Sequence, residues 1–255
     1  MALIKTKGLV IKEQAYKEQD KILTIFTEDE GKIQCMARGV RRQKSGLLAS
    51  TQIFAYGEFV YYPGKNFGII NQANLIEAFY PLRNDLTKMA LAAYLLDLIN
   101  NAFDFYQKSP EILKLLLHVL FYLSGGKAKN DLVLVGGFQL KLISVLGYRP
   151  GITQCMICKS DQEPAVFSIE SYGILCKNCK HQATGYSYKL SPGMLELIRD
   201  FLRKSIKELK EQDASIEDAT KVNDLLDHYI GYCVGKSSKA YTFYKSLLNP
   251  LSEIK

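Results

Sequence analysis

The segment 155–179 reads CMICKSDQEPAVFSIESYGILCKNC, in which two CxxC pairs stand seventeen residues apart. This spacing is typical of a tetrahedral zinc site, because each pair can form a tight turn that presents two thiolates to one ion. The sequence therefore predicts one structural Zn²⁺ bound by Cys155, Cys158, Cys176 and Cys179. A redox dithiol, an iron centre and an empty site are the alternatives. Because four protein ligands leave no open coordination position, we expect the metal to stabilise a fold and any activity to lie elsewhere.

Composition is typical of a globular intracellular protein. The 255 residues are enough for a large core, and 33 Lys and Arg against 26 Asp and Glu give a net charge of +7. The first residues have no signal-peptide pattern, which predicts a cytoplasmic protein. The longest apolar run, 115–123, is too short to span a membrane and contains His118. We expect this run to form a buried helix, with His118 in the core.

The first eighty residues have the pattern of a small β-barrel. Short runs rich in β-branched and aromatic residues alternate with turns that contain glycine. Five short strands in this length favour an OB-fold barrel over residues 1–80, with an SH3-like barrel as the alternative. The five strand candidates are 8–11, 21–27, 32–37, 54–62 and 67–76.

The pattern changes after residue 80, where long apolar segments lose the alternation of strands. The predicted fold class is α+β with several domains: the barrel, then a helical domain over 81–255, interrupted by the zinc-binding motif at 150–185. Asp85 and Asp131 are the predicted N-caps of two of the helices. The predicted helices are 85–105, 110–123, 131–146, one opened by Ser191-Pro192 and one from about Glu217.

A basic segment, RGVRRQKSG at 38–46, directly follows the third strand candidate. In an OB-fold barrel this connection lies on the rim of the groove that binds nucleic acid, where arginine and lysine neutralise phosphates. The alternative is a solvated basic loop without a ligand. Because the segment coincides with this barrel type, we interpret it as a nucleic-acid-binding site. The predicted contact residues are Lys32, Arg38, Arg41, Arg42 and Lys44.

The sequence contains no recognisable catalytic constellation. Gly235-Lys236-Ser237 resembles the end of a phosphate-binding loop, but the first glycine of that loop is missing and the segment lies in a helical pattern. The three histidines form no Ser-His-Asp or Cys-His pattern, and no carboxylate cluster suits magnesium. We therefore expect a binding protein and not an enzyme.

Four stretches resemble the RecO recombination-mediator proteins of bacteria. In the order of that family they are GLVIK at 8–12, YxExDKILTIFT at 16–27, ARGVRRxKS at 37–45 and FxLKLIxxLGYxP at 138–150. The resemblance implies an OB-fold, a helical domain and an inserted zinc motif, in agreement with the patterns above.

The resemblance also implies a function in DNA repair. RecO-like proteins bind single- and double-stranded DNA and anneal complementary strands. With RecR they help to load RecA onto DNA coated by single-strand-binding protein, and they use no nucleotide cofactor. By position, Arg38, Arg41, Arg42 and Lys44 match the basic motif of the family, and the four cysteines match its zinc ligands.

Further partners and a location follow from the same resemblance. The acidic tail of single-strand-binding protein is expected to bind a basic and apolar pocket on the helical domain, to which Lys141 and Arg149 are candidate contributors. We expect a cytoplasmic, nucleoid-associated protein without membrane contact.

Two rival functions remain open at this stage. One is a zinc-ribbon interaction module whose basic loop binds an acidic protein partner instead of DNA. The other is a nuclease or nucleotidyl transferase, which requires magnesium-binding carboxylates that the sequence does not offer.

Overall fold

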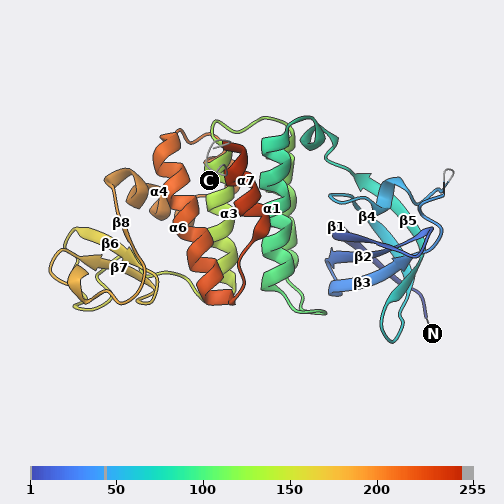
Figure 1. Cartoon of the computed structure of the whole chain (residues 1–255), viewed down its shortest axis with the longest axis horizontal. Helices are drawn as coiled ribbons and strands as arrows, with labels where there is room; N and C mark the ends of the chain where they lie inside the picture. Colours follow the sequence, from blue (N-terminus) through green and yellow to red (C-terminus); the bar gives the residue numbers. More distant parts are fainter. Residues whose placement is uncertain (1, 43–44, 249–255) are drawn as a thin grey trace, which may run out of the picture. The chain divides into compact units, whose positions relative to one another are not determined.

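The computed structural model describes residues 2–42 and 45–248, and the chain forms two compact units, 1–124 and 125–255 (Figure 1). The division into domains at residue 80 remains a prediction. The described elements of the first unit are β1 (Ile4–Tyr16), β2 (Asp20–Thr27), β3 (Gly31–Ala37), β4 (Tyr56–Tyr62), β5 (Gly68–Glu77), α1 (Leu86–Ala102) and α2 (Pro110–Ser124). Those of the second are α3 (Asp131–Val145), β6 (Pro164–Ser168), β7 (Gly173–Cys176), β8 (Ser187–Lys189), α4 (Pro192–Arg203), α5 (Ile206–Leu209), α6 (Ile216–Val234) and α7 (Lys239–Leu248).

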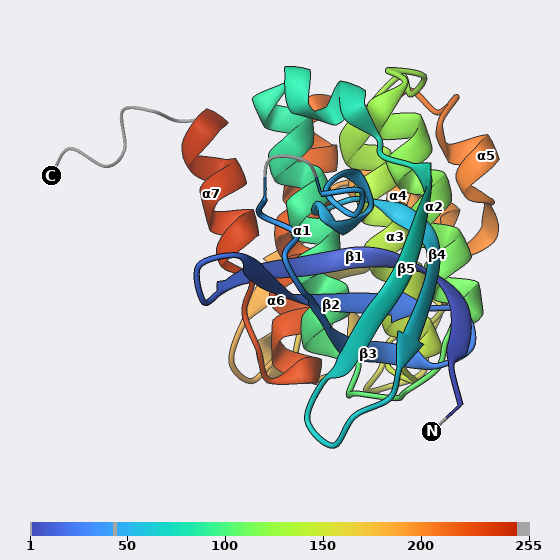
Figure 2. The same ribbon diagram turned by 90° about the vertical axis from the view of Figure 1, so that its right-hand side faces the viewer.

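The barrel closes in the order β1-β2-β3-β5-β4, with β4 pairing back to β1. Neighbouring strands are antiparallel except β3 and β5, which run parallel where Cys35 pairs with Gly68. Figure 2 shows β1, β2 and β3 side by side, with β4 and β5 crossing them. A register shift between Val10 and Lys12 bends β1, which pairs with β4 over Ile4–Leu9 and with β2 over Gly8–Tyr16. This closed five-stranded barrel confirms the predicted OB-fold.

Two helices complete the first unit. Asp85 is the N-cap of α1, as predicted, because its side chain accepts a hydrogen bond from the Lys88 N–H at 3.0 Å. Pro110 begins α2, where its missing N–H costs nothing. One face of α2 is buried, but His118 and Phe121 are exposed on the other. The expected core position of His118 is therefore wrong, because the helix is amphipathic and His118 lies on its outer face.

Helix α3 is the central helix of the second unit. Its residues 132–140 are all buried, and it packs against α4, α5 and α6. Its N-cap is Asn130, whose side chain accepts from the Leu132 N–H at 2.9 Å, and not the predicted Asp131. Asp131 instead occupies the first helical position, where a carboxylate favours the positive end of the helix dipole. Among the described helices, none combines the length and apolar character needed to cross a membrane.

A small sheet in the order β7-β6-β8 carries the second cysteine pair. The first pair is attached to it through Gly151, which donates to the Tyr172 carbonyl and accepts from the Ile174 N–H, both at 2.9 Å. A Cβ atom at Gly173 would lie 2.2 Å from the Gly151 oxygen, so this close approach requires glycine. On the other side, the ring of Phe167 lies 5.4 Å from that of Tyr229 in α6. The sheet is therefore fastened to the helices by aromatic packing.

Candidate functional site

The basic segment 38–46 begins at the end of β3, on the rim of the barrel. Arg38, Arg41 and Arg42 are exposed, whereas Val40 between them is fully buried in the barrel core. Because the valine is anchored in the core, the arginines on either side of it are held at the surface. Lys44, the fourth cation predicted here, lies outside the described residues.

Hydrogen bonds attach this loop to the turn between β1 and β2. Asp20 Oδ1 accepts from the Gly39 N–H at 2.8 Å, and the Gln19 carbonyl accepts from the Arg41 N–H at 3.0 Å. Gln19 Oε1 also accepts from Arg42 Nε–H at 2.5 Å. A guanidinium group has five N–H donors, so this contact leaves most of them for a ligand. The loop is therefore a structured cationic rim.

A row of four apolar side chains crosses the outer face of the barrel. Ile22 pairs with Met36, Met36 with Ile69, and Ile69 with Tyr62, so the row runs over β2, β3, β5 and β4. Side chains directly opposite one another lie on the same face of a sheet. Their chain neighbours, such as Cys35, are in the core, whereas none of these four is buried and Tyr62 is 44% exposed. We call this set the outer row.

One further cation is exposed elsewhere on the barrel. Lys65 is exposed in the loop 63–67 between β4 and β5. Because β5 runs parallel to β3 and begins beside Cys35, this loop extends towards the start of β3 and away from Arg38, which follows the end of β3. The sequence did not single out Lys65, an isolated lysine in a turn. The outer row was not predicted either, because only strand register reveals it.

Lys32, the fifth predicted contact residue, is 6% exposed and lies away from solvent. Its ammonium group donates to the carbonyl oxygen of Asn100 at 2.7 Å and lies 4.9 Å from the ring centroid of Phe105. Asn100 is in the last turn of α1, where carbonyl groups lack partners within the helix and carry partial negative charge. The side chain therefore fastens the barrel to α1, and we leave Lys32 out of the surface proposed below.

Replacing Lys32 with methionine should lower the free energy of unfolding by about 1–3 kcal/mol, because the partly buried Asn100 carbonyl loses a charged partner. Urea unfolding would measure this effect. Lys114→Met, at an exposed position of α2, is the matched control and should be nearly neutral. We expect DNA affinity to be unchanged; a clear loss of affinity with normal stability would return Lys32 to the binding site.

The four predicted metal ligands come together in the second unit. Their Sγ atoms all lie within 4.8 Å of one another, and those of Cys158 and Cys176 are 3.7 Å apart. Four sulfurs at about 2.3 Å from one tetrahedral zinc ion would be about 3.8 Å apart. Each pair forms a turn: the Cys155 carbonyl accepts from the Lys159 N–H at 3.0 Å, and the Cys176 carbonyl accepts from the Cys179 N–H at 3.1 Å. The cluster can therefore hold a metal ion.

Peptide groups around the cluster favour thiolates at two positions. Burial raises the pKa of Cys155, but hydrogen bonds from the backbone of Cys176, Cys158 and Ile157 outweigh it and lower that pKa to about 6. A backbone hydrogen bond from Ser160 lowers the pKa of Cys158. Burial and the neighbouring thiols raise the pKa of Cys179 to about 12. Because metals bind the thiolate, a bound cation would have to stabilise the remaining negative charge.

Comparison with known families covers nearly the whole chain. The family model described as Recombination protein O N terminal matches residues 1–79, and that described as Recombination protein O C terminal matches residues 83–242. The chain belongs to the RecO family. The resemblance found in the sequence is thereby confirmed, and membership implies a role in recombinational DNA repair.

Individual members of the RecO family agree over almost their full length. The DNA repair protein RecO of Acetivibrio thermocellus is 33% identical over 248 residues, which is 97% of this chain and 98% of that protein. The DNA repair protein RecO of Clostridium novyi is 32% identical, with 97% and 95% covered. That of Halalkalibacterium halodurans is 31% identical, with 95% and 94% covered. The chain therefore contains both halves of the RecO architecture.

Proposed function

We propose that this RecO-family protein binds single- and double-stranded DNA and anneals complementary strands by binding alone, without a nucleotide and without bond chemistry. The observation that carries the proposal is the combination of three exposed arginines, Arg38, Arg41 and Arg42, with the outer row on one barrel. Cations can contact phosphates of any sequence, while an apolar row with a tyrosine ring suits unstacked bases.

The proposed mechanism of annealing is electrostatic. Two DNA strands repel each other through their phosphates, and each phosphate that an arginine neutralises reduces this repulsion. Because the Gln19 and Asp20 contacts already order the loop, little conformational entropy is lost when DNA binds. Bases that contact Ile22, Met36, Ile69 and Tyr62 remain unpaired until a complementary strand arrives.

The four-cysteine cluster is proposed to hold one structural Zn²⁺. Sulfur-only ligands and a closed tetrahedral geometry suit zinc, and they leave no position for a substrate. The ion would stabilise the turns that carry Cys155, Cys158, Cys176 and Cys179. The ion is expected to take no part in annealing. The protein is proposed to act as a mediator and not as an enzyme.

Family membership suggests that the protein acts with RecR to load RecA onto DNA coated by single-strand-binding protein. An acidic, Phe-terminated tail of that protein requires an apolar pocket with cations. A cavity of about 410 Å³ between β6 and α4 offers Leu195 with Arg199 and Arg203, although Glu163 and Glu196 also line it. We propose this cavity as the tail site.

The earlier candidates for the tail site have less support. Lys141 is half-buried on α3, where burial lowers the pKa of its ammonium group and the charge of Glu208 opposes that shift. Arg149 is exposed after α3 but does not line the cavity beside α4. We therefore favour Arg199 and Arg203 over these two residues.

Annealing of two complementary labelled oligonucleotides, without ATP, tests the proposed function. We expect the protein to accelerate annealing at low salt. The acceleration should fall steeply between about 50 and 200 mM salt, because the release of counterions from DNA drives binding. Both strands should remain at full length in a denaturing gel. No acceleration by folded protein would reject the annealing function, and metal-dependent shortening of a strand would favour a nuclease.

A further inference from the structure

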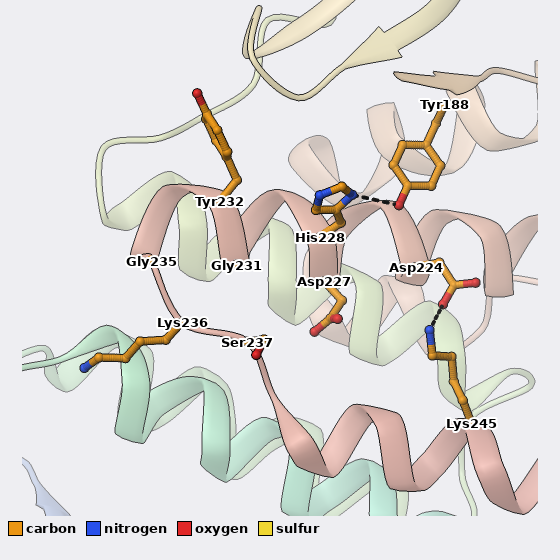
Figure 3. Close-up of a pocket in the computed structure, with 10 residues that line it drawn as sticks. All are labelled: Tyr188, Asp224, Asp227, His228, Gly231, Tyr232, Gly235, Lys236, Ser237 and Lys245. Carbon is orange, nitrogen blue, oxygen red and sulfur yellow. Dashed lines mark hydrogen bonds and ion pairs between the residues drawn. The ribbon is translucent and has the colours of Figure 1, made fainter. Parts of the chain in front are cut away.

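The cavity that Figure 3 shows in the second unit is unsuited to DNA. It has a volume of about 700 Å³, and its walls carry as many lysines as aspartates: Asp224, Asp227, Lys236 and Lys245. Lys245 Nζ lies 3.3 Å from Asp224 Oδ1, so this cation is already paired. Phosphates bind where positive charge is in excess, so the cavity adds nothing to the proposed DNA site. The barrel rim does have such an excess, but one carboxylate interrupts it.

That carboxylate belongs to Asp20, which is half-buried at the start of β2. Lys21 pairs with Ala37 at the end of β3, so Asp20 and Arg38 occupy the next positions of the two antiparallel segments. Asp20 therefore lies beside the loop that carries the exposed arginines. In a surface that binds phosphates, a negative charge at this place is unfavourable, because it repels the ligand. The presence of this carboxylate needs a reason other than charge.

The hydrogen bond of Asp20 supplies that reason. Its Oδ1 accepts from the Gly39 N–H at 2.8 Å, and Gly39 has a φ of 62°, in the left-handed region that favours glycine. The Gly39 carbonyl accepts from the Arg42 N–H at 3.2 Å, so Gly39 is also the first residue of a tight turn. Asp20 thus holds the residue at which the turn that spaces the arginines begins.

The residues before Asp20 hold the two later arginines. The Gln19 carbonyl accepts from the Arg41 N–H at 3.0 Å, and Gln19 Oε1 accepts from Arg42 Nε–H at 2.5 Å. The Lys17 carbonyl accepts from Arg41 Nη1 at 3.4 Å. The turn between β1 and β2 therefore orders the basic loop through several contacts. A loop that is ordered before binding loses less conformational entropy when it binds.

We propose that Asp20 is a positioning residue of the DNA site: its carboxylate holds Gly39, and thereby the arginines of the rim, in the arrangement that contacts phosphates. This proposal rests on the DNA-binding function proposed above. It predicts that the charge and the hydrogen bond of Asp20 act in opposite directions. Loss of the negative charge alone favours DNA, whereas loss of the hydrogen-bond acceptor disfavours it.

Two variants separate the charge from the hydrogen bond. Asp20→Asn removes the charge but keeps an oxygen that can accept from Gly39, whereas Asp20→Ala removes both. The two variants have the same net charge, so a difference between them reports the hydrogen bond. Binding of a labelled dT oligonucleotide to the full-length protein is measured by fluorescence anisotropy at about 0.1 M salt. Asp20→Asn should bind as tightly as wild type or more tightly, and Asp20→Ala about fivefold or more weakly than Asp20→Asn.

Hydrogen exchange gives a second readout that needs no DNA. In Asp20→Ala the amides of Gly39 and Arg41 should lose protection, whereas in Asp20→Asn they should keep it. The amide of Ile25, which is fully buried in the barrel core, should stay protected in both variants. This control separates local loosening of the loop from unfolding of the barrel.

Equal affinity of the two variants, or unchanged protection of the Gly39 amide in Asp20→Ala, would overturn the proposal. The outcome for wild type tells this failure apart from failure of the DNA-binding function. If wild type binds the oligonucleotide and the two variants bind it equally well, only the role of Asp20 is rejected. If folded wild type binds no DNA, the proposed function fails and the role of Asp20 fails with it.

Discussion

Replacing Cys176 with serine is expected to release the metal ion and to unfold the two CxxC turns. The reason is that this region has almost no apolar core of its own. Its buried cluster consists of three of the cysteines and Leu175, surrounded by partly buried Met156, Val166 and Ala183. A core of this size cannot offset the entropy of ordering the chain, so the proposed zinc ion would have to supply the difference. Structural zinc contributes about 10–16 kcal/mol in isolated zinc-finger peptides, which indicates how large the loss can be.

The loss should be local, because the rest of the second unit has other sources of stability. Residues 132–140 of α3 are all buried, and Phe167 of β6 packs on Tyr229 without contact to the thiols. Metal analysis should therefore find about one zinc ion per chain in wild type and nearly none in Cys176→Ser. Hydrogen exchange should show lost protection at the Cys155 and Cys179 amides, with α3 still protected.

Cys233→Ser is the matched control for this experiment. Cys233 is half-buried on α6 and lies outside the quartet, so the same change of sulfur to oxygen should leave the zinc content intact. Full zinc occupancy with unchanged amide protection in Cys176→Ser would contradict a structural metal site. A parallel loss of zinc in both variants would mean that the ion is not held by the cluster.

Local patterns predicted most of the barrel and the cysteine cluster. Strands such as 21–27 are short runs rich in β-branched and aromatic residues between turns, and such runs can be recognised without knowing the partners of the strand. The four cysteines are likewise specified by spacing, because each CxxC turn is formed by its own backbone hydrogen bonds. The strands and the cysteine turns, which depend on short stretches of chain, were therefore predicted correctly.

Features that depend on distant segments were missed. Lys32 lies upstream of the basic segment in sequence, but the connection between α1 and α2 packs on β3, where the Tyr106 N–H donates to the Lys32 carbonyl at 2.9 Å. No local sequence pattern predicts that contact. The outer row was missed for a similar reason, since Met36 and Ile69 come together only through the register of β3 and β5.

One miss was avoidable from the sequence. The helix opened by Ser191-Pro192 was predicted without a second helix after it, but α4 ends at Arg203 and Ser205 begins α5 with a capping box to Glu208. The pattern Ser-x-x-Glu is a helix-start signal that can be read directly. The buried carboxylate of Asp200 then stabilises the break, because it accepts from Lys204 Nζ at 2.8 Å and from Gln212 Nε2 at 2.9 Å.

Replacing both Arg41 and Arg42 with alanine is expected to weaken DNA binding strongly and to reduce its salt dependence. Each phosphate contact contributes about 0.7 to the slope of log affinity against log salt for single strands and about 0.9 for duplex DNA. Two lost contacts therefore lower the affinity at 0.1 M salt by roughly 25-fold for single strands and 60-fold for duplexes, if the affinity at 1 M is unchanged. Titrations at several salt concentrations would give both quantities.

A lower stability or a lower net charge of the double variant could also weaken DNA binding, so both must be separated from the loss of phosphate contacts. Arg41 and Arg42 are exposed, so their removal should cost little stability, and thermal unfolding checks this. The double variant Lys207→Ala with Lys221→Ala removes the same charge from exposed positions of the second unit. If the effect comes from direct phosphate contacts, only the arginine variant should change the salt slope. An equal change in both variants would mean that net charge governs binding, and an unchanged slope in the arginine variant would remove the barrel rim from the DNA site.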